Sequence, residues 1–189
     1  MHLRKRWIGF VLGGLWMLIS LACTINLGGP TPPAPLPTPD PNALQNLEDT
    51  WTQAVEASLD GHVTVTITQE QLTALLAAKL AADPEALFQH PQVVLENNEM
   101  VIYGQVQKGN VVANVRMVIT VSVDDEGKPE FALASADFGP WPAPDGLLEA
   151  ISGMLNEAFT GAIGPVATGI RIESITMSQG AMTIQGRIR

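Results

Sequence analysis

The feature that most constrains the fold is a long run of alternating apolar and polar residues from Val111 to Val123. Alternate side chains of an extended strand point to the same face. The run therefore places one apolar set on one face: Val111, Ala113, Val115, Met117, Ile119, Val121 and Val123. At about 3.3 Å per residue the run extends over roughly 40 Å, about twice the length of a typical strand. A strand of this length usually curves, and the concave side of a curved sheet needs a long filler.

Further strands are predicted on both sides of this run. The pairs Asn97-Asn98 and Gly109-Asn110 fit hairpin turns, because these residue types tolerate a positive φ. The segment 124–129 also turns the chain. The sequence therefore predicts an antiparallel sheet with additional strands at 62–68, 92–96, 100–107, 130–138, 169–177 and 181–188.

Two helices are predicted near the start of the domain. The first is amphipathic, begins after Asp40-Pro41 as N-cap and first helical position, and continues to Gly61. The segment Thr68–Gln71 fits a capping box, in which the Thr68 hydroxyl accepts from the first turn and Gln71 reaches back. It opens a second helix that ends near Asp83-Pro84.

The segment 145–166 is the predicted filler of the curved sheet. Apolar residues recur along it at helical spacing, and its only charged residues are Asp145, Glu149 and Glu157. Membrane-surface helices favour a basic polar face, so we expect this long helix to lie inside its own protein. Dry packing against the sheet and a ligand-binding channel both stay open. A channel would be lined by Val115, Met117, Ile119, Val121, Leu147, Ile151, Leu155 and Phe159.

Residues 1–22 have the organisation of an export signal. The basic residues Arg4–Arg6 precede an apolar run at 7–21, and the only cysteine of the chain, Cys23, follows. Residues 19–23 resemble a bacterial lipobox, in which cleavage leaves Cys23 at the N-terminus with a diacylglyceryl anchor. An uncleaved helix with a buried Cys23 is the alternative. In both cases the basic residues stay on the cytoplasmic side, so everything after residue 25 is expected outside.

Residues 23–41 are predicted to be a proline-rich linker. Seven of the 14 prolines of the chain lie between Gly28 and Pro41. Proline lacks the backbone N–H donor and fixes φ, so such a segment cannot build a helix or a ladder. An extended polyproline chain rises about 3.1 Å per residue, so this segment could hold the domain, residues 42–189, roughly 40 Å from the membrane.

The charge distribution argues against a nucleic-acid partner. The chain carries 10 Lys+Arg and 19 Asp+Glu, a net charge of −9, and three of the basic residues belong to the signal. An acidic domain with dispersed basic residues offers no patch for a phosphate backbone. Recognition of a lipid headgroup is therefore expected to be weak or tolerant of zwitterionic lipids.

No residue cluster predicts catalysis. A single cysteine excludes an intramolecular disulfide and a Cys-rich metal site, and no serine lies in a Gly-x-Ser-x-Gly motif. Neither His62, before a strand, nor His90, in a predicted loop, has metal-ligand spacing. The acidic segment Asp124–Glu126 lacks the alternating ligands of a calcium loop. We predict no enzyme, metal or cofactor; a hydrolase with one of these histidines as general base is the remaining alternative.

Five stretches carry a resemblance to a known family, namely Val65–Leu76, Asn98–Gly104, Gly127–Phe131, Phe138–Pro144 and Ile170–Ile188. With these stretches, the chain from Val63 to Arg189 resembles a family of anchored extracytoplasmic bacterial proteins typified by YpmS and, more distantly, by the lipoprotein LmeA. The resemblance implies an α+β fold of the tubular lipid-binding (TULIP-like) type, in which a strongly curved antiparallel sheet wraps around a long amphipathic helix. It also implies an apolar channel between them, and it carries over no catalytic residue.

These observations lead to one functional expectation and one alternative. We expect a lipoprotein anchored through Cys23 on the extracytoplasmic side of the cell membrane, or on an outer membrane if the source has one. Its domain would bind phospholipid or a related lipid in an apolar channel without catalysis. The alternative is a structural or assembly lipoprotein with a dry core, whose partner is another envelope protein.

Overall fold

The longest strand organises a five-stranded sheet. The computed structural model describes residues 25–33, 42–82, 88–140, 149, 152–153, 156–157 and 169–188. Strand β5 (Val111–Val123) pairs along one edge with β4 (Glu99–Lys108), and β3 (Phe88–Glu96) follows β4. The other edge of β5 is long enough for two partners, β6 (Pro129–Asp137) and β1 (Ile25–Asn26). All these pairs are antiparallel except β1–β5, which is parallel, so the sheet is mixed.

A second sheet has three strands in the order β2–β8–β7, all antiparallel. Its strands are β2 (His62–Thr68), β8 (Ala181–Ile188) and β7 (Ile170–Ser178). Buried and exposed residues alternate regularly in β2: Val63, Val65 and Ile67 are buried, and the residues between them are exposed. One face of this sheet therefore lies on the core.

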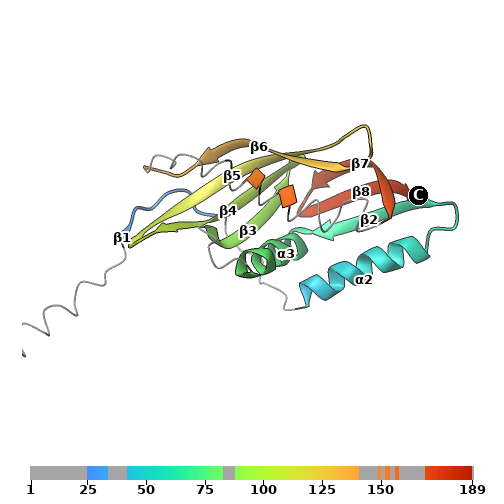
Figure 1. Cartoon of the computed structure of the whole chain (residues 1–189), viewed down its shortest axis with the longest axis horizontal. Coiled ribbons are helices and arrows are strands. Elements are labelled where there is room, and N and C mark those ends of the chain that lie inside the picture. Colours follow the sequence, from blue (N-terminus) through green and yellow to red (C-terminus); the bar gives the residue numbers. More distant parts are fainter. Residues whose placement is uncertain are drawn as a thin grey trace, which may run out of the picture.

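Backbone hydrogen bonds join the two sheets into one strongly curled half-barrel (Figure 1). The Asn98 N–H donates to the Met177 carbonyl at 3.0 Å, and the Gly180 N–H donates to the Leu95 carbonyl at 2.9 Å. At another point the Ile172 N–H donates to the Gly127 carbonyl at 3.1 Å. Each of these bonds joins a turn of one sheet to a strand of the other.

Two helices, α2 (Ala43–Glu56) and α3 (Gln69–Ala82), lie on the same side of the sheets (Figure 1). The predicted capping box at the start of α3 is confirmed: the Gln71 N–H donates to Thr68 Oγ1 at 3.3 Å, and the Thr68 N–H donates to Gln71 Oε1 at 2.9 Å.

Helix α3 also covers the free edge of β3. The Val93 N–H donates to Thr73 Oγ1 at 2.9 Å, and the Leu95 N–H donates to Gln69 Oε1 at 3.4 Å. A covered edge cannot template pairing with another chain. The side chains of α3 thus protect a strand that would otherwise end the sheet with unpaired donors.

The core fills the space enclosed by the curled sheets and α3. One cluster of buried apolar side chains includes residues from α2, α3 and strands β2 to β8. The largest side chains that are almost fully buried are Phe88, Ile67, Leu72, Leu76, Leu95, Met100, Ile102, Met117 and Ile119.

Most predicted boundaries agree with the structure, and the differences have local causes. The predicted strands 62–68, 111–123 and 181–188 are confirmed with the same bounds. The first helix was predicted to continue to Gly61, but α2 ends at Glu56 and Leu59 is 99% exposed. Leu59 continues the apolar spacing and yet contacts no core, because the chain has already left the helix.

Three further expectations differ from the structure or fall partly outside the residues that it describes. The sheet was predicted to be antiparallel, and the parallel β1–β5 pair makes it mixed. The Asp40-Pro41 cap lies outside the described residues. Of the predicted helix 145–166, the structure describes Glu149, Ser152, Gly153, Asn156 and Glu157, all helical, so a single long helix is not shown.

No helix in the described ranges combines the length and the apolar character that a membrane span requires.

Candidate functional site

The inner face of the five-stranded sheet is the face on which the predicted channel residues of β5 lie. Val115, Met117 and Ile119 are at most 1% exposed and belong to the hydrophobic cluster. Opposite them on β4, Ile102 pairs with Met117 and is also fully buried. Over this stretch the inner face is covered completely.

Coverage decreases toward the end of β5. Val121 and Val123 are half-buried and pack against the cluster rather than inside it. Leu133 and Ala136 on the neighbouring strand β6 are half-buried as well. The inner face therefore has a sealed middle and an incompletely covered end, with apolar side chains on both strands.

The other four predicted channel residues are Leu147, Ile151, Leu155 and Phe159, and they lie outside the described residues. The helical positions described in the same segment are spaced three and four residues apart, so they occupy one helix face. Glu149, Gly153, Asn156 and Glu157 are exposed on that face, and Ser152 is half-buried.

The segment that follows Cys23 is attached to the sheet edge, whereas Cys23 itself lies outside the described residues. We call residues 25–33 the N-terminal strap. The Ile25 N–H donates to the Asn110 carbonyl at 2.7 Å, and the Leu27 N–H donates to the Val112 carbonyl at 2.9 Å. Farther along, the Asn114 N–H donates to the Gly28 carbonyl at 2.9 Å.

This attachment changes the expected geometry of the linker. The sequence predicted a free spacer from Gly28 onward, but the strap residues run along β5. Ile25 begins β1 only two residues after Cys23. Ile25 and Leu27 are 56% and 37% exposed, so the strap presents apolar side chains next to the predicted anchor.

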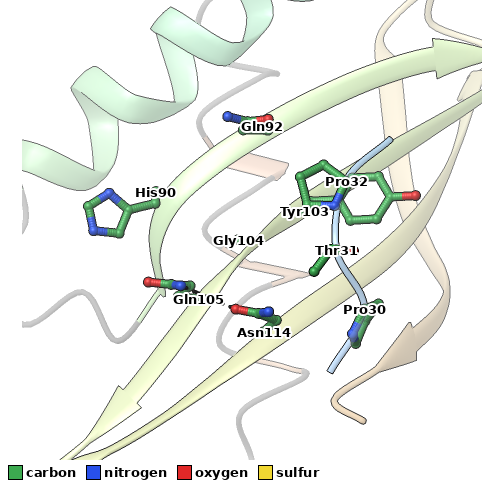
Figure 2. A pocket seen from close by; sticks show the side chains of 9 residues that line it. All are labelled: Pro30, Thr31, Pro32, His90, Gln92, Tyr103, Gly104, Gln105 and Asn114. Carbon is green, nitrogen blue, oxygen red and sulfur yellow. Dashed lines mark hydrogen bonds between the residues drawn. The ribbon is translucent and has the colours of Figure 1, made fainter. Parts of the chain in front are cut away.

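A pocket lies on the opposite, outer face of the same sheet. Its volume is about 330 Å³. Inward residues of β4 such as Ile102 and Val106 alternate with outward residues such as Tyr103 and Gln105. The outward side chains reach the pocket, and so does the backbone of Gly104 between them. Figure 2 shows the side chains that line it: Pro30, Thr31, Pro32, His90, Gln92, Tyr103, Gly104, Gln105 and Asn114.

A bulge in β3 forms one wall of this pocket. The register with β4 shifts between Gln89 and Gln92, and His90 has a φ of 52°. Pro91 cannot donate to a ladder, which is why prolines within sheets lie at edges or bulges. The sequence placed His90 in a loop, whereas β3 starts at Phe88 and His90 lies in the bulged strand.

In the acidic turn 124–128, the Asp124 side chain accepts hydrogen bonds from the backbone of the same turn. Asp124 Oδ1 accepts from the N–H groups of Glu126 at 2.9 Å and Lys128 at 2.8 Å. Glu126 also forms an exposed ion pair with Lys128. Within the part of the chain that the structure describes, no three His, Cys, Asp or Glu side chains form a group that could hold a metal ion.

The sequence interpretation missed the outer pocket. Two signals were present: a proline directly before the predicted strand 92–96, Pro91, and a glycine in the middle of a strand, Gly104, which often marks a close approach of another group. Neither signal says that residues 30–32 lie above the same spot, because that segment is far away along the chain.

No protein-family model, curated protein or solved structure matches this chain. The resemblance to YpmS- and LmeA-like proteins therefore stays a prediction.

Proposed function

We propose that this protein is a non-catalytic extracytoplasmic lipoprotein whose domain binds lipid along the inner face of its curled sheet. The proposal includes the TULIP-like arrangement implied by the family resemblance, with the segment 145–166 as a long helix along that face. Phospholipid or a related lipid is the proposed ligand, and Cys23 is the proposed membrane anchor.

The graded coverage of the inner face is the observation that carries this proposal. Burial is complete at Val115 and Ile119, but Val121, Val123 and Leu133 remain half-buried. Apolar side chains left partly in water favour an additional apolar partner, because each Å² removed from water contributes about 25 cal/mol. An acyl chain entering at the β5–β6 end would provide that partner.

The pattern of segment 145–166 supports the same proposal. The described residues of this segment are polar or small and mostly exposed, as expected of the solvent face of an amphipathic helix. The predicted channel residues Leu147, Ile151 and Leu155 occupy other positions of the helical repeat. We infer that they face the sheet and line the channel together with β5.

The strap supports the proposed location at a membrane. A diacylated Cys23 would stand two residues before β1, so the domain would lie against the bilayer rather than about 40 Å away. The exposed Ile25 and Leu27 would then be close to the lipid surface. Short tethering shortens the path that a lipid would travel to the domain.

Native mass spectrometry tests the lipid proposal. Residues 24–189, which keep the strap but lack the anchor, would be expressed in a bacterial host and purified without detergent. We expect a population whose mass exceeds that of the polypeptide by the mass of a phospholipid. The variant Val121→Lys should lose this population, because a charged ammonium group cannot be desolvated beside an acyl chain without a large cost.

The matched control is Ser122→Lys, which adds the same charge at the adjacent, exposed position of β5. This variant should retain the lipid. A bare polypeptide mass for the unmodified chain, together with no transfer of fluorescent phospholipid from vesicles, would contradict the lipid proposal.

One observation favours the second candidate function, a dry-core assembly lipoprotein. Val115, Met117 and Ile119 are sealed, as they would be in a core that never opens. A bare mass in the experiment above would therefore support this function.

The anchor has its own test. Cys23→Ala removes the only thiol of the chain, so we expect the protein to lose metabolic palmitate label and to leave the membrane fraction of its native host. Cys23→Ser serves as a near-isosteric control that should behave in the same way. Palmitate label that persists in either variant would show that Cys23 is not the acylated residue.

A further inference from the structure

Beside the outer pocket lies one polar atom that has no partner in the protein. Gln92 lines the pocket, and its Oε1 is less than 1 Å² exposed and accepts no hydrogen bond. Buried polar atoms of native proteins nearly always have a partner, so each exception calls for a ligand, a water or another explanation. Rotation of the terminal amide would turn either its oxygen or its nitrogen toward the pocket.

A pair of amides, Gln105 and Asn114, lies across the pocket from Gln92 (Figure 2). Gln105 Nε2 donates to Asn114 Oδ1 at 3.2 Å. This bond uses one donor of Gln105 and one acceptor site of Asn114. The bond fixes the orientation of both amides and leaves the Asn114 amino group and the Gln105 carbonyl for a ligand.

The remaining lining combines apolar rings with a floor that carries no side chain. Figure 2 shows Pro32 beside the ring of Tyr103 on one side, His90 on the other, and Gly104 between them. The strap is bonded to β5 just before these prolines, because the Asn114 N–H donates to the Gly28 carbonyl at 2.9 Å. Polar groups and rings therefore surround the backbone of Gly104.

The lining includes no Asp, Glu, Lys or Arg side chain. A phosphate or a carboxylate would meet no fixed positive charge, and a cationic ligand would meet no carboxylate. An acyl chain would leave the amides without partners, at the cost of their desolvation. The chemistry that fits is a neutral ligand with hydroxyl groups, because each hydroxyl both donates and accepts and each amide offers both functions.

From this combination we propose that the outer pocket binds a neutral saccharide unit. Amide side chains of Gln92, Gln105 and Asn114 hydrogen-bond its hydroxyl groups, and the rings of Tyr103 and Pro32 pack on its C–H face. The volume of about 330 Å³ lies at the small end of the range for ligand pockets, roughly 300–1,000 Å³. That size suits one or two sugar rings. The site is separate from the inner face and does not depend on the proposed lipid function.

A saccharide unit of this kind has two sources, the headgroup of a neutral glycolipid and a free or wall-derived sugar. Tyr103 is the only tyrosine of the chain, so incorporation of fluorotyrosine gives a single ¹⁹F resonance at the pocket. The full chain would be placed in phosphatidylcholine nanodiscs. Detergents with sugar headgroups would be avoided, because their headgroups are themselves neutral saccharides.

The first arm titrates soluble glucose, galactose, maltose and trehalose, with glucuronate and glucose 6-phosphate as charged counterparts. The second arm compares nanodiscs of phosphatidylcholine alone with nanodiscs that also contain digalactosyldiacylglycerol. We expect a saturable shift of the ¹⁹F resonance with at least one neutral sugar or with the glycolipid. A response to soluble sugar alone assigns the free saccharide, and a response to the glycolipid alone assigns the headgroup.

Two variants test the residues. Gln92→Leu and Asn114→Leu should each weaken the response roughly tenfold or more, as expected for loss of one hydrogen bond to a ligand hydroxyl. The matched control is Gln107→Leu, the same change on the outer face of β4 but outside the pocket, and it should leave the affinity unchanged. An unshifted ¹⁹F resonance without ligand would verify that each variant retains the fold.

Three results would overturn the proposal. The first is the absence of a ¹⁹F shift with every neutral sugar and with the glycolipid. The second is tighter binding of the charged sugars than of the neutral ones. The third is an affinity of both Gln92→Leu and Asn114→Leu equal to that of the unmodified chain. None of these results bears on lipid binding at the inner face, because the mass measurement and the Val121→Lys variant report on that face separately.

Discussion

A single residue decides how β3 and β4 pack near the outer pocket. A Cβ atom at Gly104 would lie 2.3 Å from Phe88 Cζ and 2.9 Å from the Gln89 carbonyl oxygen. Phe88 is 1% exposed and belongs to the core cluster. The Phe88 ring therefore occupies the volume that any other residue at position 104 would need.

Gly104→Ala should consequently lower the free energy of unfolding by about 1–3 kcal/mol, the usual cost of overpacking. The measurement is the midpoint of chemical denaturation. In a Phe88→Leu background, Gly104→Ala should lower the free energy of unfolding by less, because leucine leaves room for the new methyl group. Equal costs in the two backgrounds would show that Phe88 is not the obstacle.

Gly153→Ala provides a control of the same type. Gly153 is helical and exposed, and a Cβ there would meet no atom within 4 Å. Because alanine loses less backbone entropy than glycine in a helix, this variant should be neutral or more stable by about 0.5–1 kcal/mol.

At the scale of elements, the β3–β4 hairpin turn connects the two sheets. Asn97 and Asn98 have φ of 50° and 62°, as the turn requires. Beyond its backbone bond to Met177, Asn98 accepts from the Met177 N–H through Oδ1 at 3.0 Å. Asn98 thus pairs with both backbone groups of Met177, as a neighbouring strand would do at this point of β7.

Asn98→Gly should keep the turn, because glycine tolerates the positive φ, but it leaves the Met177 N–H without its acceptor. We expect a loss of about 1–3 kcal/mol in the free energy of unfolding, the cost of an unsatisfied part-buried donor. Calorimetry or denaturant titration measures it. Asn97→Gly has the same effect on backbone entropy without this bond, so a comparable loss in both variants would contradict the assignment.

At the scale of the whole molecule, the strap completes the sheet edge. Without residues 25–33 the carbonyls of Asn110 and Val112 and the N–H of Asn114 would lose their partners. An unpaired edge is a template for pairing with a second chain. We therefore expect residues 42–189 to self-associate, whereas residues 24–189 stay monomeric.

Analytical ultracentrifugation over a range of concentrations measures this difference. The variant Leu27→Pro in residues 24–189 removes only the N–H that donates to the Val112 carbonyl, and it should show an intermediate tendency to associate. A monomeric, equally stable 42–189 chain would show that the strap is dispensable for the edge.

Features that depend only on neighbouring residues could be predicted from the sequence. Alternation fixed the face of each residue in β2 and β5, because successive side chains of a strand point to opposite sides. The capping box at Thr68 and the turn at Asn97-Asn98 were predictable because their hydrogen bonds and φ angles involve residues at most three positions apart. The α+β class followed from strand-like alternation and helical spacing in the same chain, and the strong curvature followed from the length of β5.

Contacts between distant segments are known only from the three-dimensional structure. The parallel β1–β5 pair joins residues more than 80 positions apart, and local patterns carry no information about such pairing. The outer pocket likewise needs the strap, the bulge at His90 and the outward side chains of β4 and β5 at one place. The incomplete coverage of Val121 could not be predicted either, because alternation gives the direction of a side chain and burial depends on what the rest of the chain places over it.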